Sequence, residues 1–388
     1  MKIIFLFLIT VNFVSGQNPK EYVRGCYFTN WAQYRPGRAK FSPNNYQPGL
    51  CSHIFYAFAY VDANFNPIPS DPSDIGPDGQ YGQINNLKSA DPKLKTLLSF
   101  GGASFSSFTF SQLVSSGANR KVFIDSAISY LRQHNFDGID IDWEYPSAND
   151  KKNFLFLITE FKNAAESESK KTGKSRLLVT AAVAAGIANT AGYDFRNLAQ
   201  VLDFINVMTY DFHGSWETVT GHNSPLFNRS GETDFQQQLN TAYVANYYHF
   251  QGFPKEKLVI GIPTYGRGWT LSNSGNSGVG ASATSTSNPF QFTQTAGIGS
   301  YYEICEVVAS GGSRIFDHQA RVPYVVNGNQ WFSYDDIEST ENKANWIKNN
   351  GFGGGFFWTL DFDDFNGQCS NSGGTKYPII GTLKKILG

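Results

Sequence analysis

Charged residues are scarce in this sequence. Asp, Glu, Lys and Arg together make up 16% of the 388 residues, and the formal net charge is -1. Lys and Arg never follow one another in a run of more than two. Nucleic acids and acidic membrane surfaces attract proteins through clustered positive charge. The sequence therefore predicts neither kind of partner.

The patterns that hold metal ions and dinucleotides are also missing. The six histidines are scattered, no CxxC pair occurs, and no GxGxxG opens a helix after the first predicted strand. Metal ligands occur at short, regular spacings, and dinucleotide folds need the glycine-rich turn. We therefore expect no metal ion and no cofactor.

Long apolar runs are confined to the first residues. Residues 3–14 form an apolar stretch behind Lys2, and the small residues Ser15 and Gly16 follow. This order is typical of a secretory signal peptide and is too short for a membrane span. We expect a signal peptide at 1–16, a secreted, extracellular chain that begins at Gln17, and no membrane partner. A sequon predicts glycosylation at Asn228. No signal for oligomerisation is readable, and we expect a monomer.

Cysteine is sparse, but the count is even. The four residues are Cys26, Cys51, Cys305 and Cys369. An even number in an exported chain favours two disulfides, for which three connectivities are possible. The least tangled one joins Cys26 to Cys51 and Cys305 to Cys369, and this is the pairing that we predict.

Short apolar runs of strand type recur along the chain, separated by amphipathic segments such as 120–134 and 153–170. The runs lie at residues 23–28, 53–59, 96–100, 138–142, 177–182, 204–208, 258–262 and 354–358. Strands that alternate with helices predict a parallel sheet, and eight of them favour closure into a barrel. We therefore predict an α/β fold, a (β/α)8 TIM barrel over residues 17–388.

One connection is too long for a barrel helix alone. Between residues 262 and 354 the chain contains a stretch rich in Ser, Gly and Thr at 272–287, and then new strand-like and helical pieces. This pattern predicts a small α+β insertion at 266–334, between the seventh and eighth barrel strands. Neither a Ser/Thr/Pro-rich linker nor a cysteine-dense module follows the last predicted helix, so we expect no appended domain.

The fourth predicted strand carries three acids, Asp140, Asp142 and Glu144, at alternate positions. Alternate side chains share one face, so the acids should line the barrel interior up to its C-terminal end, where barrel active sites form. Burying three carboxyl groups is unfavourable unless they share protons or hydrogen bonds, so at least one should be protonated at neutral pH. Glu144, nearest the mouth, can present a proton to a substrate. A structural cluster or a hard-cation site is the competing interpretation, but a calcium loop needs its ligands on a flexible turn.

The stretch DGIDIDWE at 137–144 resembles the DxxDxDxE signature of family 18 glycoside hydrolases, the chitinases and their relatives. Other strand ends resemble the same family, in the family's order. They are YFTNW at 27–31, FYAF at 55–58, SFGG at 99–102, MTYD at 208–211, YGR at 265–267 and GGFFW at 354–358. The resemblance covers nearly all of the mature chain.

The resemblance implies substrate-assisted hydrolysis. Glu144 would protonate the glycosidic oxygen and later deprotonate water. The 2-acetamido oxygen of the sugar would attack its own anomeric carbon and give an oxazolinium ion, with retention of configuration. Asp142 would hydrogen-bond the acetamido N–H and stabilise that cation. Asp140 would lie deeper and share a proton with Asp142, and Tyr210 would hold the acetamido carbonyl in line for attack.

The resemblance also implies sugar contacts around the barrel mouth, with a tryptophan as the floor under the cleaved sugar. The matching positions are Tyr27, Phe58, Gly102, Ala103, Tyr145, Met208, Asp211, Tyr265, Arg267 and Trp358. We interpret Phe58 and Met208 as packing in the pocket wall. Trp31 and Trp216 are candidates for stacking further sugars.

One position departs from the family pattern. Many members carry an aromatic residue directly after Ser-x-Gly-Gly, and here that residue is Ala103. We expect that Phe105, two residues further on, does not replace the missing ring. Together with the lack of a recognisable chitin-binding module, the departure predicts weaker binding on the leaving-group side. We expect good activity on soluble oligosaccharides and poor, weakly processive activity on crystalline chitin.

The predicted function is that of a secreted, endo-acting chitinase that hydrolyses β-1,4 linkages of N-acetylglucosamine polymers, with chitin and chito-oligosaccharides as its partners. A non-catalytic chitin-binding lectin of the same fold is the alternative, and such relatives typically lose the acid that Glu144 supplies. A growth-factor-like signalling relative would depart at the catalytic acids, and no departure is present there. Di-N-acetylchitobiase is a further enzymatic relative, but the insertion and the strand-end motifs fit chitinases better.

Overall fold

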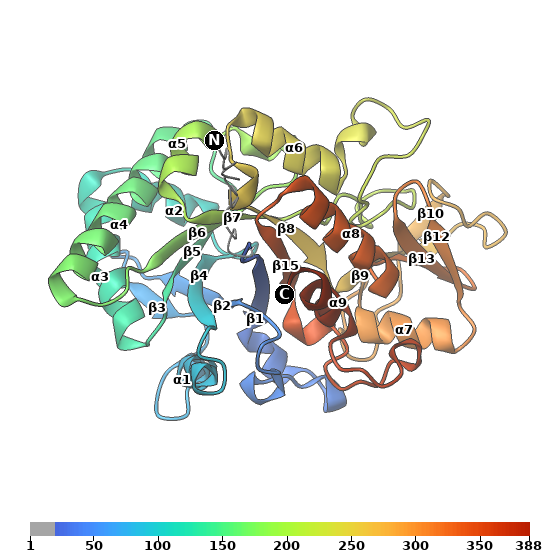
Figure 1. Cartoon of the computed structure of the whole chain (residues 1–388). Coiled ribbons are helices and arrows are strands. Elements are labelled where there is room, and N and C mark those ends of the chain that lie inside the picture. The colour runs from blue at the N-terminus through green and yellow to red at the C-terminus, as the bar shows by residue number, and fades with distance from the viewer. Residues whose placement is uncertain (1–19) are drawn as a thin grey trace, which may run out of the picture.

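A closed parallel barrel surrounded by helices forms the centre of the structure (Figure 1). The structure is a computed structural model and describes residues 20–388. The predicted signal peptide at 1–16 and Gln17 lie outside the described residues. No helix in the described part of the chain is both long enough and apolar enough to cross a membrane.

Each of the eight predicted runs forms one barrel strand. The strands are β1 (Val23–Thr29), β2 (His53–Val61), β4 (Lys95–Gly101), β5 (Gly138–Asp142), β6 (Leu178–Val183), β7 (Phe204–Val207), β8 (Leu258–Pro263) and β15 (Gly354–Trp358). They pair in parallel in the order β1-β15-β8-β7-β6-β5-β4-β2, and β1 also pairs with β2, which closes the ring. A short strand, β3 (Pro67–Pro69), pairs antiparallel with the end of β2. The predicted TIM barrel is confirmed.

The barrel strands bury both of their faces. On β1, Tyr27 packs in an inner cluster that fills the barrel, whereas the next residue, Phe28, belongs to the large outer core under the helices. The same alternation places Phe55 of β2 inside and Tyr56 outside. Because successive side chains of a strand point to opposite faces, an almost continuous apolar run is needed to bury both faces of each barrel strand.

The helices pack around the outside of the barrel. They are α1 (Gln80–Asn86), α2 (Ser107–Val114), α3 (Gly117–Gln133), α4 (Lys151–Thr172), α5 (Phe195–Val201), α6 (Thr241–Gln251), α8 (Ile337–Asn350) and α9 (Pro378–Leu387). The α3 helix begins three residues before the predicted start at 120, because the Ser116 side chain accepts a hydrogen bond from the Asn119 N–H and caps it.

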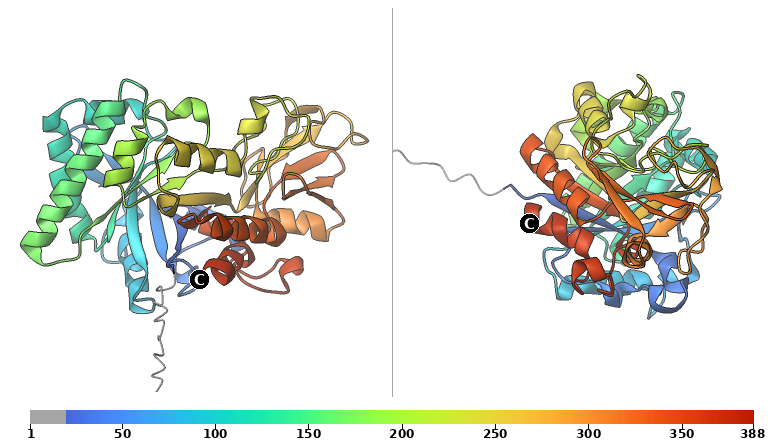
Figure 2. Two further views of the ribbon diagram at one scale, coloured as in Figure 1. Left: turned by 45° about the horizontal axis from the view of Figure 1, so that its top comes forward. Right: turned by 90° about the vertical axis from the view of Figure 1, so that its right-hand side faces the viewer.

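A second, antiparallel sheet is inserted between β8 and β15. It contains β9 (Tyr265–Leu271), β10 (Ala283–Thr286), β11 (Ile298–Ser300), β12 (Ser313–Asp317), β13 (Val322–Asn327) and β14 (Gln330–Ser333), with α7 (Tyr301–Ala309) between β11 and β12. Figure 2 shows this sheet at one end of the molecule, on the opposite side of the barrel from α3 and α4. An insertion at the predicted place in the chain is therefore present.

Two disulfides fix connections at the edge of the barrel. Cys26 on β1 is joined to Cys51 just before β2, with Cα atoms 6.1 Å apart. Cys305 on α7 is joined to Cys369 after β15, with Cα atoms 5.8 Å apart. The predicted pairing is confirmed, and the second bond ties the insertion to the segment that follows the last barrel strand.

Removal of the second disulfide should be the more destabilising of the two removals. The Cys305–Cys369 bond closes a separation of 64 residues and the Cys26–Cys51 bond one of 25. A longer loop loses more entropy on closure, so Cys305→Ser/Cys369→Ser should lower the free energy of unfolding by about 2–4 kcal/mol, more than Cys26→Ser/Cys51→Ser does. Chemical denaturation followed by tryptophan fluorescence measures both values. An equal or larger loss at the shorter loop would contradict this ranking.

Candidate active site

The three acids of β5 lie where the alternation predicts. Asp140 and Asp142 are buried, and the side chains of Ile139 and Ile141 pack on the other face, in the outer core. Glu144 follows the end of the strand, where the exposure rises toward the barrel mouth. The strand therefore delivers a row of carboxyl groups from the barrel centre to its C-terminal edge.

Asp140 is held by hydroxyl groups from three other strands. Its Oδ2 accepts from Tyr27 of β1 at 2.8 Å and from Ser99 of β4 at 2.7 Å, and its Oδ1 accepts from Thr180 of β6 at 2.7 Å. Hydrogen bonds to a carboxylate stabilise its charged form and oppose the cost of burial. Asp142 has no such set, because its Oδ1 is buried without a hydrogen-bond partner among the described residues.

Burial dominates the electrostatics of the three acids. It raises the pKa of Asp140, against the effect of the three hydroxyl donors. Burial also raises the pKa of Asp142 well above its usual range, and the charges of Glu144 and Asp140 add to the shift. The pKa of Glu144 is raised by burial and then by the charge of Asp211. All three shifts favour the protonated form, because burial and the neighbouring acids disfavour the charged carboxylates.

A cavity of ≈ 430 Å³ opens above these acids. It is lined by Trp31, Phe58, Ala103, Ser104, Asp142, Glu144, Tyr145, Ala185, Gly186, Asn189, Met208, Tyr210, Asp211, Tyr265, Arg267, Ile298, Trp358 and Phe362. Most of the residues that the sequence predicts for the site are therefore brought together at one opening. The lining joins apolar rings to a few convergent polar groups, which is the usual composition of a site for a small organic ligand.

Two predicted contact residues do not line the cavity. Tyr27 is buried below it, where its hydroxyl donates to Asp140. Gly102 lies behind the wall, and a Cβ atom there would come within 2.4 Å of the Phe58 ring. Its φ of 87° also favours glycine. The two residues thus act through their neighbours, Tyr27 by holding Asp140 and Gly102 by leaving room for Phe58.

Aromatic rings form one wall of the cavity. The Phe58 ring stacks with the rings of Trp31 and Trp358, each at a centroid distance of 5.9 Å. The β2–β4 register shifts between Ala57 and Ala59, so Phe58 faces the cavity although its neighbour Ala57 also packs in the inner cluster. Trp31 is 40% exposed, which leaves much of its surface open at the mouth.

Asp211 connects the end of β7 to the inserted sheet. Its carboxylate accepts from the Tyr265 hydroxyl at 2.6 Å and from Arg267 Nε and Nη2 at 2.7 Å each. The Arg267 guanidinium also lies 5.1 Å from the centre of the Trp216 ring, which is exposed but outside the cavity lining. Asp211, Tyr265 and Arg267 are therefore fixed to one another by hydrogen bonds at this side of the cavity.

Several lining residues were missed by the sequence analysis. Ile298 reaches the cavity from β11 of the insertion, and Phe362 from the turn after β15. Asn189 comes from the connection after β6. None of the three belongs to a motif, and only the folded chain brings them to the barrel mouth.

The structure supports the expectation about Phe105. Its ring stacks on Tyr60 at 5.0 Å and meets the edge of Phe110 at 5.1 Å, and it does not line the cavity. Ala103 does line the cavity and is exposed. The Phe105 ring therefore does not replace the aromatic residue that is missing at Ala103.

No arrangement for a metal ion is found here. Within residues 20–388, no group of three or more His, Cys, Asp or Glu side chains is placed to hold one. The fold and the site thus define a (β/α)8-barrel protein with a row of carboxyl groups under an aromatic-lined cavity at the C-terminal end of its fourth strand. Residues 23–363 match the family described as Glycosyl hydrolases family 18, and the chain belongs to this family.

Similar proteins include both enzymes and a binding protein. A probable endochitinase of Caenorhabditis elegans is 52% identical over 98% of this chain, which spans 63% of that protein's length. The crystal structure of an immunomodulatory active chitinase from Trichuris suis is 48% identical, with a TM-score of 0.93 over 95% of this chain and 100% of that one. Human YKL-39, described as a pseudo-chitinase with retained chitooligosaccharide binding, is 42% identical, with a TM-score of 0.90 over 95% of this chain and 100% of that one.

Proposed function

We propose that this protein is a secreted chitinase that cuts β-1,4 linkages within N-acetylglucosamine polymers, with retention of configuration and with the substrate's own acetamido group as the nucleophile. The observation that carries the proposal is the presence of Glu144 at the cavity wall beside a buried Asp142 whose Oδ1 has no hydrogen-bond partner within residues 20–388. One group can give a proton to a leaving oxygen, and the other can accept a hydrogen bond from a substrate amide.

Glu144 acts as the acid and then as the base. Burial raises its pKa, which keeps the carboxyl group protonated at a pH where an exposed glutamate would be ionised. Its proton passes to the glycosidic oxygen as the bond from that oxygen to the anomeric carbon breaks. The resulting carboxylate later takes a proton from the water that attacks the same carbon.

The acetamido group replaces an enzyme nucleophile. Its carbonyl oxygen bonds to the anomeric carbon as the leaving group departs, and Asp142 accepts the N–H and offsets the positive charge of the oxazolinium ring. Tyr210, which lines the cavity beside these acids, holds the carbonyl in line. Because the nucleophile is already part of the bound sugar, its effective concentration is high and little orientational entropy is lost in the attack.

A single assay separates this proposal from the lectin alternative. Purified protein is mixed with fluorogenic conjugates of chitobiose and chitotriose, and binding of unlabelled chitotetraose is measured in parallel by calorimetry. We expect steady release of the fluorophore together with binding. Binding without release would assign the chain to the non-catalytic proteins, which is the behaviour described for its relative YKL-39.

The Ala103 position provides a prediction about how tightly the cavity binds its substrate. Ala103→Trp would place a ring at the open side of the cavity, where a stacked ring is worth roughly 0.5–1.5 kcal/mol, or a tightening of about two- to tenfold. We expect tighter binding of oligosaccharides and a larger share of transglycosylation, because a held sugar competes with water as the acceptor. Calorimetry and product analysis measure the two effects.

Ala103→Leu is the matched control for this variant, since it adds bulk without an aromatic face. Equal gains from Leu and Trp would show that apolar area alone is responsible. Unchanged binding and products in Ala103→Trp would show that no sugar is bound next to this position.

The remaining predictions concern secretion, oligomeric state and glycosylation. We propose that the chain is secreted as a monomer and glycosylated at Asn228, which is exposed in the loop between β7 and α6. Intact mass before and after treatment with an N-glycosidase, and light scattering of the purified protein, test these two points.

A further inference from the structure

A buried polar tripeptide lies behind the cavity wall, in the loop between β7 and α6. It consists of His222, Asn223 and Ser224, which are 3%, 0% and 1% exposed. None of the three lines the cavity. Polar side chains this deeply buried are stable only when hydrogen-bonded, so their partners show what the tripeptide fixes in place.

Asn223 holds the backbones of Asp211 and Tyr265, two residues that line the cavity. Its Oδ1 accepts from the backbone N–H of Asp211 at 3.0 Å, and its Nδ2 donates to the backbone carbonyl of Tyr265 at 3.1 Å. Asp211 has a φ of 57°, in the left-handed region that a residue with a side chain rarely adopts. The Asn223 bond therefore supports the unusual backbone that aims the Asp211 carboxylate at Tyr265 and Arg267.

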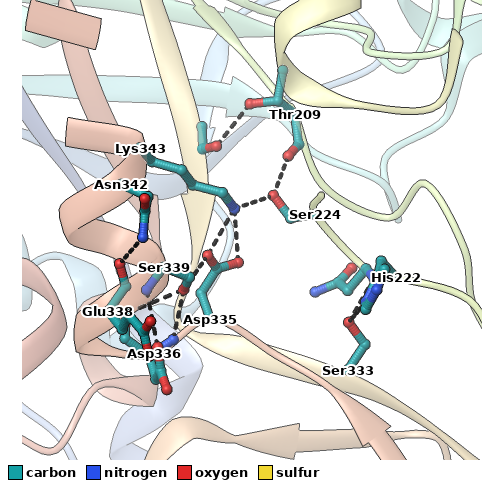
Figure 3. A network of polar contacts seen from close by, with 12 residues as sticks. Thr209, His222, Ser224, Ser333, Asp335, Asp336, Glu338, Ser339, Asn342 and Lys343 are labelled. Carbon is teal, nitrogen blue, oxygen red and sulfur yellow. Dashed lines mark hydrogen bonds and ion pairs between the residues drawn. The ribbon is translucent and has the colours of Figure 1, made fainter. Parts of the chain in front are cut away.

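Ser224 holds the backbone on the other side of Tyr210. Its hydroxyl donates to the Thr209 carbonyl at 2.6 Å, and the Thr209 hydroxyl in turn donates to the Gly261 carbonyl of β8 at 2.7 Å. Tyr210 thus lies between two residues whose backbone groups are fixed by the tripeptide, Thr209 through Ser224 and Asp211 through Asn223. Figure 3 shows the contact between Ser224 and Thr209.

Lys343 and Asp335 form a buried ion pair that contacts Ser224. The Lys343 ammonium of α8 donates to Ser224 Oγ at 2.7 Å and lies 2.7 and 2.9 Å from the two carboxylate oxygens of Asp335. Lys343 is 0% and Asp335 1% exposed. With its lone pair accepting from a cation, the Ser224 hydroxyl is oriented to donate toward Thr209, as Figure 3 shows.

The same network reaches the insertion. Asn223 N donates to the hydroxyl of Ser333 at 3.0 Å, at the end of β14, and Asp335 follows two residues later. Ser339 on α8 donates to Asp335 Oδ1 at 2.8 Å. The tripeptide is therefore the point where a barrel-strand end, the inserted sheet and an outer helix are joined by hydrogen bonds.

We propose that Asn223 and Ser224 are positioning residues that hold Tyr210 and Asp211 in their places at the cavity wall, with the Lys343–Asp335 pair as the support that orients Ser224. The kinetic part of this inference rests on the proposed function. Stability alone does not account for the arrangement, because replacing a buried ion pair by packed apolar residues is often neutral or stabilising. The ion pair instead orients the Ser224 hydroxyl, because one hydrogen-bond donor of Lys343 is used for Ser224 Oγ.

Ser224→Ala tests the proposal directly. It removes the donor to Thr209 and leaves Lys343 paired with Asp335. Because small misplacements of groups that align a reaction are costly, we expect kcat to fall about tenfold while KM changes little. Asn223→Ala should act in the same direction and more strongly, since it frees Asp211 as well.

Ser339→Ala is the matched control. It also removes a buried serine hydroxyl from the network, but on the far side of Asp335 from Thr209. We expect a lower Tm with an unchanged kcat. A loss of kcat in Ser339→Ala as large as in Ser224→Ala would show that general destabilisation explains both, and would overturn the positioning role.

Lys343→Met/Asp335→Leu separates orientation from folding. The double variant removes both buried charges, so neither is left unpaired, while Ser224 loses the cation that directs its hydroxyl. We expect a Tm close to that of the parent together with a reduced kcat. A fully active double variant would show that Ser224 needs no support from the ion pair.

Hydrogen exchange gives a readout that does not depend on activity. Mass spectrometry of the peptide covering residues 208–212 should show faster amide exchange in Ser224→Ala and Asn223→Ala than in the parent or in Ser339→Ala. Unchanged exchange there would overturn the positioning role. An inactive parent would refute the hydrolase proposal alone, because the exchange measurement would still decide whether the tripeptide fixes this segment.

Discussion

Glu144→Gln is expected to remove nearly all hydrolysis of chito-oligosaccharides and to leave their binding intact. Glutamine keeps the size and polarity of the side chain at the cavity wall, but it has no transferable proton. A general acid contributes about 10²–10⁴ to a rate, and the same group serves in both chemical steps, so turnover should fall by several orders of magnitude. Fluorophore release from a chitotriose conjugate measures turnover, and calorimetry with chitotetraose measures binding.

Glu341→Gln is the control for this variant, because Glu341 is an exposed glutamate on α8. It should behave as the parent in both assays. Near-normal turnover in Glu144→Gln would remove Glu144 from the mechanism. A loss of binding equal to the loss of turnover would instead point to a disturbed cavity.

Substrates without the acetamido group should not be cut at all. Cello-oligosaccharides have the same β-1,4 linkage and ring shape, but they carry a hydroxyl where the proposed nucleophile would be. Neither acid at the cavity takes over this role in the proposed mechanism, because Glu144 transfers the proton and Asp142 accepts the acetamido N–H. We expect no detectable glucose products under conditions that consume chito-oligosaccharides completely.

The same mechanism fixes the stereochemistry of the first product. Attack by the acetamido oxygen and then by water inverts the anomeric carbon twice, so the β-anomer should form before mutarotation. Proton NMR in the first minutes of hydrolysis distinguishes the anomers. An initial α-anomer would require direct attack by water, and any cleavage of cello-oligosaccharides would require a nucleophile from the protein.

The barrel itself was predictable because its signal is local. Each strand of a closed parallel barrel buries both faces, so it appears as a short apolar run, and the eight runs in the sequence correspond to the eight barrel strands. The insertion was found from a connection too long for one helix. The disulfide pairing followed from the preference for the least tangled connectivity among three.

The chemical centre of the site was predictable for a similar reason. Asp140, Asp142 and Glu144 belong to one strand, and a period of two places them on one face without any knowledge of the rest of the chain. The ring wall was only partly predictable. Phe58 faces the cavity because of a register shift between β2 and β4, which depends on how two strands pair.

The sequence by itself determined the order of strands and helices, the row of acids and the residues at the strand ends, because these depend on neighbours within a few positions. The tertiary structure alone decided that Tyr27 lies below the cavity, where its hydroxyl donates to Asp140. It also decided that Ile298 and Phe362 help to enclose the cavity. It alone joined Ser224 to Lys343, 119 positions apart. Such contacts depend on the relative placement of whole elements, and hydrogen bonds between distant residues leave no periodic trace in the order of amino acids.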